Sequence, residues 1–208
     1  MPDKLSAILE RSRQLGYLGP GEPAAHRAHA AAFIDAWDSC REAPPATFCD
    51  LGAGGGVPGL VLALHWPGTK SVLLEASSRR CSFLEAAILE LGLATTVSVA
   101  PGRAETLART SELEASFELV TARSFGPPAV VAECAARLLA PRGVLMVSEP
   151  PDAERTAARW PDEGLAMLAL GPAVPSKASR HLVVIERAGP CPSRFPRRVG
   201  IPSKRPLF

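Results

Sequence analysis

The sequence has few cysteines, few histidines and no long apolar segment, and these shortages restrict what the protein can be. Its five cysteines are odd in number and form no Cys-x-x-Cys pair. This argues against a disulfide framework and favours a reducing, cytoplasmic setting. The four histidines offer no cluster of ligands, so we expect no bound metal. The start of the chain lacks the basic-then-apolar order of a signal peptide. The longest uncharged run, residues 51–69, is broken by glycines and prolines, so we expect no membrane partner.

Acidic residues are missing from residues 189–208, although they are frequent elsewhere. This tail has a formal charge of +5, whereas the rest of the chain has a charge of −3. A basic, proline-rich tail on a mildly acidic body suggests an anionic partner. The same composition would also suit a solubilising tail or a strap that lies across the domain.

The hydrophobic pattern predicts an α/β protein with helices at its N-terminus. Helices are expected over residues 3–15 and 23–39, and from residue 47 strands alternate with helices, which is typical of an open α/β sheet. The expected strands are 48–51, 70–75, 95–99, 117–121, 143–148, 165–170 and 181–186. The expected helices between the first six strands are 57–65, 78–91, 103–110, 127–140 and 152–160.

The spacing of the expected elements also predicts how the chain is organised. The last two strands leave no room for a helix between them, so they should form an antiparallel pair at one edge of the sheet. We divide the chain into an N-terminal helical extension (1–45), a sheet domain that binds the cofactor (46–188) and a basic tail (189–208).

A glycine-rich loop follows the first expected strand, where such a sheet binds a nucleotide-like ligand. Gly54-x-Gly56-x-x-Gly59 matches the dinucleotide fingerprint, whereas Asp50-x-Gly52-x-Gly54-x-Gly56 matches the loop of class I S-adenosylmethionine (SAM) methyltransferases. We favour the second motif because Gly54 comes too late after the strand for a dinucleotide loop. A carboxylate at Asp50 would also face the cationic groups of SAM but repel a pyrophosphate. A purely structural glycine turn is the remaining alternative.

The second expected strand ends in Glu75, which is a further candidate cofactor residue together with its neighbour Ala76. A carboxylate in this place can accept hydrogen bonds from both ribose hydroxyls of a nucleoside. Because NAD and SAM sites share this feature, it supports a nucleoside ligand without choosing between the two.

Five stretches of the chain together resemble the GidB/RsmG family of 16S rRNA methyltransferases. They occur in the family's order, at residues 50–60, 79–84, 102–106, 120–123 and 181–185. The resemblance implies the Rossmann-like class I fold of SAM-dependent methyltransferases with a seven-stranded sheet, SAM as cofactor and S-adenosylhomocysteine as product. It places the family's cofactor contacts on Gly52, Val57, Ala104, Glu105 and Arg123. The full candidate cofactor set is then Asp50, Gly52, Gly54, Gly56, Val57, Glu75, Ala76, Ala104, Glu105 and Arg123.

The resemblance also implies a substrate, namely N7 of a guanine in small-subunit (16S) rRNA. Guanine N7 has a free lone pair and no proton, so its methylation requires no general base, and we name no catalytic residue. Arg123 should face the substrate, and basic residues of the tail should contact RNA phosphates, with Phe195 stacking on an unpaired base. The candidate RNA contacts are Arg123, Arg194, Arg197, Arg198, Lys204 and Arg205. We expect a monomer whose partner is rRNA or the small ribosomal subunit.

Two departures from the family pattern keep other functions open. Only 49 residues precede Asp50, fewer than is usual in the family, and Ser148 and Glu149 stand where a Lys-Gly pair is common. Both features suit a SAM-dependent methyltransferase that acts on a small molecule. The third hypothesis is a SAM-sensing or RNA-binding protein without enzymatic activity.

Overall fold

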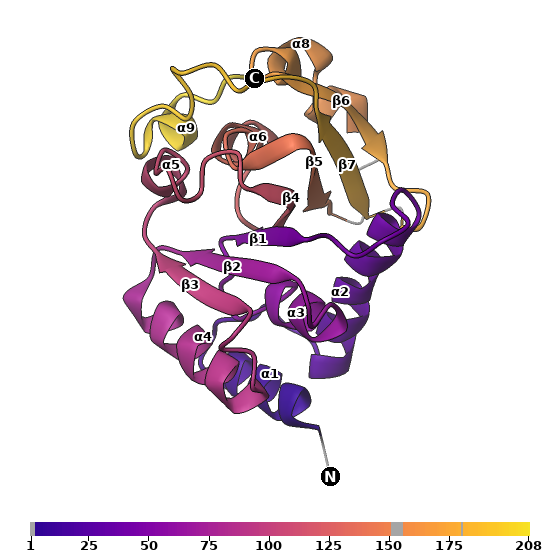
Figure 1. Cartoon of the computed structure of the whole chain (residues 1–208), viewed down its shortest axis with the longest axis vertical. Coiled ribbons are helices and arrows are strands. Elements are labelled where there is room, and N and C mark those ends of the chain that lie inside the picture. The colour runs from indigo at the N-terminus through magenta and orange to yellow at the C-terminus, as the bar shows by residue number, and fades with distance from the viewer. Residues whose placement is uncertain (1–2, 151–155, 180) are drawn as a thin grey trace.

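The computed structural model describes residues 3–150, 156–179 and 181–208, which form one seven-stranded sheet with helices on both faces (Figure 1). The strand order is β3-β2-β1-β4-β5-β7-β6. The strands are β1 (Thr47–Leu51), β2 (Lys70–Glu75), β3 (Val97–Pro101), β4 (Phe117–Ala122), β5 (Leu139–Ser148), β6 (Leu170–Pro175) and β7 (Leu182–Arg187). The helices are α1 (Lys4–Gln14), α2 (Pro23–Asp38), α3 (Gly59–His65), α4 (Ser78–Leu91), α5 (Ala104–Leu107), α6 (Pro128–Ala136), α7 (Thr156–Arg159), α8 (Asp162–Ala166) and α9 (Ile201–Lys204). The predicted fold class is confirmed.

The central strands carry apolar side chains on both faces, because alternate residues point to opposite sides of the sheet. Phe48 of β1 belongs to one hydrophobic cluster, and its neighbour Cys49 belongs to the other. Strand β1 pairs in parallel with β2 on one side and with β4 on the other. The direction of the strand order therefore reverses between β1 and β4, and ligands of such sheets bind outside the carboxyl ends of these two strands.

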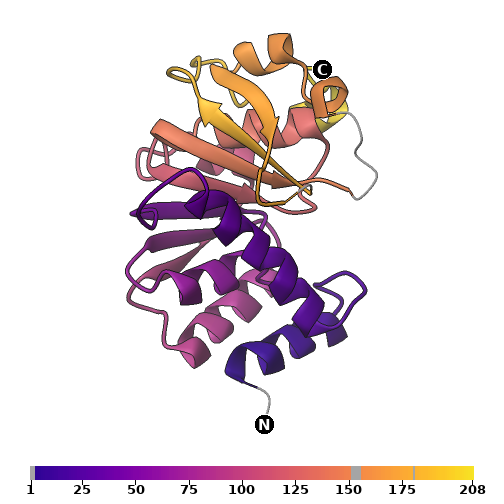
Figure 2. The same cartoon turned by 90° about the vertical axis from the view of Figure 1, so that its right-hand side faces the viewer.

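Helices α1 to α4 cover one face of the sheet (Figure 2), and their apolar side chains fill the first cluster with residues such as Phe33, Trp37 and Leu84. Helices α5, α6 and α8 contribute to the second cluster on the opposite face. In the residues that the structure describes, no helix is both long and apolar enough to cross a membrane.

The far edge of the sheet is antiparallel, as predicted, since β7 pairs in this way with both β5 and β6. The strand predicted over residues 165–170 is wrong, because α8 occupies residues 162–166 and β6 begins only at Leu170. The local chemistry explains this helix: Pro161 precedes it, and Asp162 and Glu163 lie in its first turn, where negative charge is favourable.

Other predicted boundaries differ by a few residues. The helix expected over 127–140 ends at Ala136, and β5 begins at Leu139, where it pairs with Phe117 before a bulge. Of the helix expected over 152–160, α7 covers residues 156–159, and residues 152–155 lie outside the described part of the chain.

Residues 189–208 form a strap that packs on the second face of the sheet domain, beside α5 and α6 (Figure 1). We call this segment the C-terminal strap. Phe195 is only 2% exposed within the second cluster, so the prediction that it stacks on a base is wrong. At the end of the strap, the Phe208 ring lies against Gly164, where an added Cβ would collide with it.

Candidate cofactor site

The glycine loop between β1 and α3 is folded back onto the end of β2. The backbone N–H groups of Gly52 and Ala53 both donate to the carbonyl oxygen of Leu74, at 2.9 and 3.0 Å. Gly52, Gly54 and Gly56 all have positive φ angles, of 73°, 53° and 93°. Side chains with a Cβ rarely adopt this conformation, so the glycines are required by the shape of the loop.

Glu75 at the end of β2 connects the loop to the following helix. Its side chain is buried, and its two carboxylate oxygens accept hydrogen bonds from the backbone N–H groups of Gly54 (2.9 Å) and Ser77 (2.8 Å). An ionised carboxylate has about four acceptor positions, so it still has capacity for the hydroxyl groups of a ligand. The structure thus brings Glu75 to the glycine loop, as its predicted role requires.

Asp50 lies beneath the loop and is only 1% exposed. Its carboxylate accepts hydrogen bonds from the backbone N–H of Gly59 and from the hydroxyl of Thr121, both at 2.9 Å. Burial raises the pKa of Asp50 to about 6, although these two hydrogen bonds and the charge of Arg123 act in the opposite direction. Asp50 therefore holds the start of α3 against β4, which differs from the direct contact with a cation that the sequence suggested.

Replacing Asp50 with asparagine is expected to remove a pH dependence of the protein's stability. The pKa is raised from 3.8 to about 6 by folding, so the contribution of this group is complete below pH 4 and is lost as the pH rises through 6. The shift corresponds to about 3 kcal/mol. Urea unfolding without ligand should show the variant gaining about this amount relative to the wild type between pH 4 and pH 7. Parallel pH profiles for the two proteins would contradict the assignment.

Arg123 follows β4 at the point where the strand order reverses, and α2 holds it from the opposite side. An Nη2 hydrogen donates to Nδ1 of His26 at 2.8 Å, and Nε2 of His26 lies 3.2 Å from the carbonyl oxygen of Gly19. These partners fit a neutral histidine with its proton on Nε2. Burial lowers the pKa of His26, and the positive charge of Arg123 lowers it further. His26 is thus a positioning residue for the guanidinium.

Among the residues that the structure describes, Nη1 of Arg123 and Nε2 of His29 are buried and have no hydrogen-bond partner. Burial also lowers the pKa of Arg123, and the nearby charge of Asp50 opposes that shift. Because buried donors in folded proteins are nearly always paired, the free Nη1 hydrogens indicate a place for an acceptor that a ligand supplies.

Comparisons with known proteins show the family of this chain. The family model "GidB: rRNA small subunit methyltransferase G" matches residues 26–159, which include both His26 and Arg123. The chain belongs to the GidB family. It is 36% identical over 169 residues to "Ribosomal RNA small subunit methyltransferase G" of Synechococcus sp. (strain CC9902), an alignment that covers 78% of this chain and 70% of the relative. The protein of the same name from Chloroflexus aggregans is 36% identical over 170 residues, with the same coverage.

Solved structures support the fold of this GidB family member. An O-methyltransferase from Bacillus cereus in complex with SAH is similar with a TM-score of 0.61 and 16% identity, over 90% of this chain and 91% of that one. The cofactor-bound Rv0187 from MTB gives a TM-score of 0.60 and 18% identity, over 90% and 91% of the two chains. At these identities the likeness concerns the fold alone.

SAM fits the residues that this GidB family member brings together. The positive φ angles of the loop glycines let the backbone approach a ligand closely, and an added Cβ on Gly54 would find no atom nearer than 3.6 Å. Glu75 offers acceptor capacity to ribose hydroxyls, and the free Nη1 hydrogens of Arg123 suit the carboxylate of the methionine moiety. The residues that would hold the cofactor therefore come from the loop, β2 and the end of β4.

The remaining predicted cofactor residues differ in their burial and in the contacts of their side chains. Val57 and Ala104 are buried, and Ala76 is exposed beside Glu75. Glu105 follows Ala104 in α5, but its carboxylate accepts a hydrogen bond from the backbone N–H of Gly200 in the C-terminal strap, at 2.9 Å. Its side chain is thus engaged by the strap, which leaves the backbone of this segment as the part to consider for the adenine.

The sequence did not identify the segment before α2 as part of the site. The hydroxyl of Ser12 donates to the carbonyl oxygen of Gly55 at 3.0 Å, and an added Cβ on Gly55 would come within 2.8 Å of Leu18. On the other side, the ring of Phe125 lies against Gly52, since an added Cβ there would come within 2.5 Å of it. A polar residue on the apolar face of a helix, such as Ser12, was the available signal.

The predicted RNA contacts in the C-terminal strap separate into two groups. The guanidinium of Arg197 binds the carboxylate of Glu133, with an Nη2 to Oε2 distance of 2.6 Å, and Glu133 is fully buried. Arg197 therefore anchors the strap and is not available to RNA, which corrects the prediction for this residue. The other four, which are exposed, are Arg194, Arg198, Lys204 and Arg205.

Proposed function

We propose that this protein is a SAM-dependent methyltransferase that methylates guanine N7 in small-subunit (16S) rRNA. Membership of the GidB family carries the proposal, through 36% identity over 169 residues to a relative that is named as a methyltransferase of small-subunit ribosomal RNA. Three features support the choice of SAM as cofactor. The glycine loop allows the backbone to approach the ligand closely, Glu75 suits the ribose hydroxyls, and Arg123 suits the carboxylate of the methionine moiety. The proposed partner is accordingly the small-subunit rRNA, in the cytoplasm.

The mechanism assigned to this chain is one of binding and alignment. The cofactor supplies a methyl group on a sulfonium centre, which makes that carbon open to attack by a neutral nitrogen. The protein has to hold the two reactants in line, and such positioning accounts for a large part of the rate of a two-reactant step. Arg123, oriented by its hydrogen bond to His26, and the glycine loop, held by Glu75, would hold the cofactor. No side chain has to remove a proton from N7.

One argument for the small-molecule alternative is weakened by the structure. Glu149 belongs to the Ser148-Glu149 pair that stands where a Lys-Gly pair is common in the family, and a free carboxylate there would suit a small cationic substrate. Its side chain is instead buried, and it accepts hydrogen bonds from Nε of Arg159 (2.5 Å) and Nε1 of Trp160 (3.1 Å). Glu149 thus binds Arg159 at the end of α7 and its neighbour Trp160, and its carboxylate is not free.

The decisive experiment measures transfer of labelled methyl groups from SAM to small ribosomal subunits that lack the modification. We expect the label in 16S rRNA, recovered after nuclease digestion as N7-methylguanosine. A metabolite extract is assayed in parallel, and an Arg123→Met variant serves as the inactive control. Label that appears only in the small-molecule fraction would contradict the proposed substrate. Absence of label in both fractions, despite measurable SAM binding, would contradict the proposed activity.

A further inference from the structure

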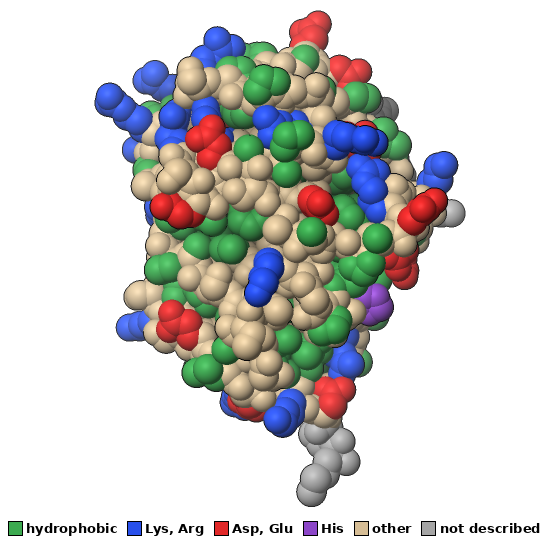
Figure 3. All heavy atoms as spheres, in the orientation of Figure 1, with side chains coloured by type: hydrophobic (Ala, Val, Ile, Leu, Met, Phe, Trp, Pro, Cys, Tyr) green, Lys and Arg blue, Asp and Glu red, His purple; other side chains and the backbone are tan. Residues whose placement is uncertain are grey.

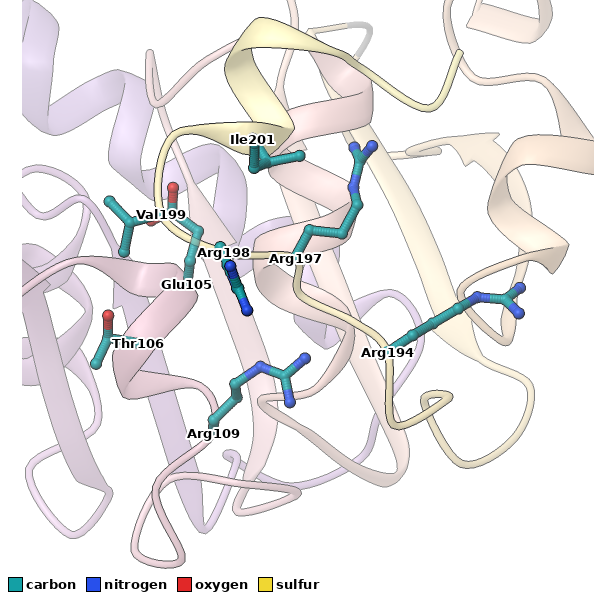
Figure 4. A pocket seen from close by; sticks show the side chains of 8 residues that line it. All are labelled: Glu105, Thr106, Arg109, Arg194, Arg197, Arg198, Val199 and Ile201. Atoms are coloured by element: carbon teal, nitrogen blue, oxygen red, sulfur yellow. The ribbon is translucent and has the colours of Figure 1, made fainter.

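A basic groove separates α5 and the loop after it from the C-terminal strap (Figure 4). It has a volume of about 930 Å³. Its walls include Glu105, Thr106 and Arg109 on one side and Arg194, Arg197 and Arg198 on the other. Figure 3 shows Lys and Arg side chains gathered at the upper left of the molecule, over the region where the C-terminal strap lies in Figure 1.

The walls of this groove are held rigidly by hydrogen bonds. Arg137 donates from Nε to the carbonyl oxygen of Phe195 (2.5 Å) and from Nη2 to that of Pro192 (2.9 Å). Arg197 is turned away from the groove in Figure 4 and binds Glu133. The C-terminal strap therefore presents its remaining cations on a fixed backbone.

Arg109 and Arg198 point toward one another across the groove (Figure 4). Nε and Nη2 of Arg109 donate to the carbonyl oxygen of Pro196, at 2.9 and 2.7 Å, which fixes the orientation of its guanidinium. Within the described part of the chain, no carboxylate lies within 4 Å of a nitrogen of either guanidinium. The acid on the wall, Glu105, accepts its hydrogen bond from Gly200. Two arginines that face each other without an acid between them suit the oxygens of a phosphate group.

A polynucleotide backbone is the anion that fits this groove. The groove is lined in part by Glu105, in the segment of α5 that is a candidate for the adenine of the cofactor, so a chain lying in it would pass beside the proposed cofactor site. The aromatic ring nearest to these arginines in the C-terminal strap, that of Phe195, is buried. The groove therefore offers contacts to phosphates and no exposed platform for stacking bases.

We propose that this groove binds the phosphate backbone of the RNA substrate, with Arg109 and Arg198 as paired phosphate ligands and Arg194 at the margin. This inference rests on the proposed function, since it assigns to the RNA a surface outside the methyl-transfer site. Arg197, which neighbours Arg198 in sequence, shapes the groove and does not contact the RNA.

The test measures binding of 16S rRNA to the full-length protein across a series of KCl concentrations. The Arg194→Gln/Arg198→Gln variant removes two exposed charges and no hydrogen bond that holds the C-terminal strap. We expect about a tenfold loss of RNA affinity at moderate salt, and a slope of log affinity against log salt that is smaller by about 1.4–1.8. SAM affinity should not change, and the unfolding midpoint should fall only slightly, because Arg194 also lies over the ring of Phe195, with its Cζ 4.9 Å from the ring centre. The matched control, Lys70→Gln/Arg142→Gln, removes the same charge at the opposite end of the parallel strands, and its RNA affinity should stay within twofold of the wild type.

The outcomes separate this inference from the function on which it rests. Equal losses of RNA affinity in the groove variant and the control would contradict RNA binding in the groove, because they would show only an effect of net charge. An unchanged affinity in the groove variant would overturn it as well. Competition by polyglutamate as strong as that by unlabelled RNA would replace the RNA groove with a general anion surface. If the groove variant loses salt-sensitive RNA binding as expected, but the wild type transfers no methyl group to the rRNA, the groove stands and the proposed activity fails.

Discussion

Replacing Arg123 with methionine should lower the affinity for SAM by at least about 30-fold, and methyl transfer should become undetectable. The variant would remove the buried donor that we assign to the cofactor's carboxylate. Truncating one partner of a buried, hydrogen-bonded charge pair costs about 2–5 kcal/mol, and the lower value already corresponds to about 30-fold. Isothermal titration calorimetry with SAM measures the effect directly.

The control for this prediction is Lys70→Met, which removes an exposed cation at the opposite end of β2 from Glu75. Its SAM affinity should match that of the wild type. Arg123→Lys should fall between the wild type and the methionine variant, because a single ammonium group lacks the planar fork that serves both His26 and a carboxylate. An Arg123→Met variant that binds SAM within threefold of the wild type would remove Arg123 from the proposed site.

Replacing Arg197 with methionine is expected to lower the free energy of unfolding by about 3–5 kcal/mol. The carboxylate of Glu133 is fully buried in α6, and Arg197 supplies its neutralising charge through both Nε and Nη2. Without this partner, an uncompensated charge would remain in the protein interior. Urea unfolding at pH 7 measures the loss.

Two further variants test the cause of this destabilisation. Arg198→Met changes the neighbouring arginine, which is exposed, and should alter the stability by no more than about 0.5 kcal/mol. Combining Arg197→Met with Glu133→Gln removes the buried charge and should restore a large part of the lost stability. A loss below about 1 kcal/mol in Arg197→Met would show that Glu133 finds another partner.

The arrangement of strands and the glycine loop could be predicted from the sequence because their signals are local. Alternating apolar strands and helices define the sheet, and the glycines at positions 52, 54 and 56 match the positive φ angles that the loop adopts. The strand predicted over 165–170 failed because its apolar residues also fit a short helix. That choice depended on Pro161 and on the packing of Gly164 against Phe208.

The roles of individual side chains depended on contacts between distant parts of the chain. Asp50 was identified as a site residue, but its partner Thr121 lies 71 positions away, so its burial and its hydrogen bonds could not be read from the motif. The role of His26 could not be predicted from the sequence, because its partner Arg123 is 97 positions away. Arg197 and Arg198 are adjacent, yet one is an anchor and the other is exposed. The available signal was Glu133, a single acid in an otherwise apolar helix, which requires a basic partner when it is buried.

The order of strands in the sheet also determines at which stage of synthesis the sheet can be completed. Strand β6 pairs with β7 alone, and β7 lies between β6 and β5. A ribosome that has made the chain as far as Pro175 has therefore produced a strand without a neighbour, while the edge of β5 is still uncovered. Exposed strand edges promote association between chains. The nascent protein is consequently open to association through the edge of β5 in the interval between the emergence of β5 and that of β7, and truncated products that end there should associate more readily than the whole chain.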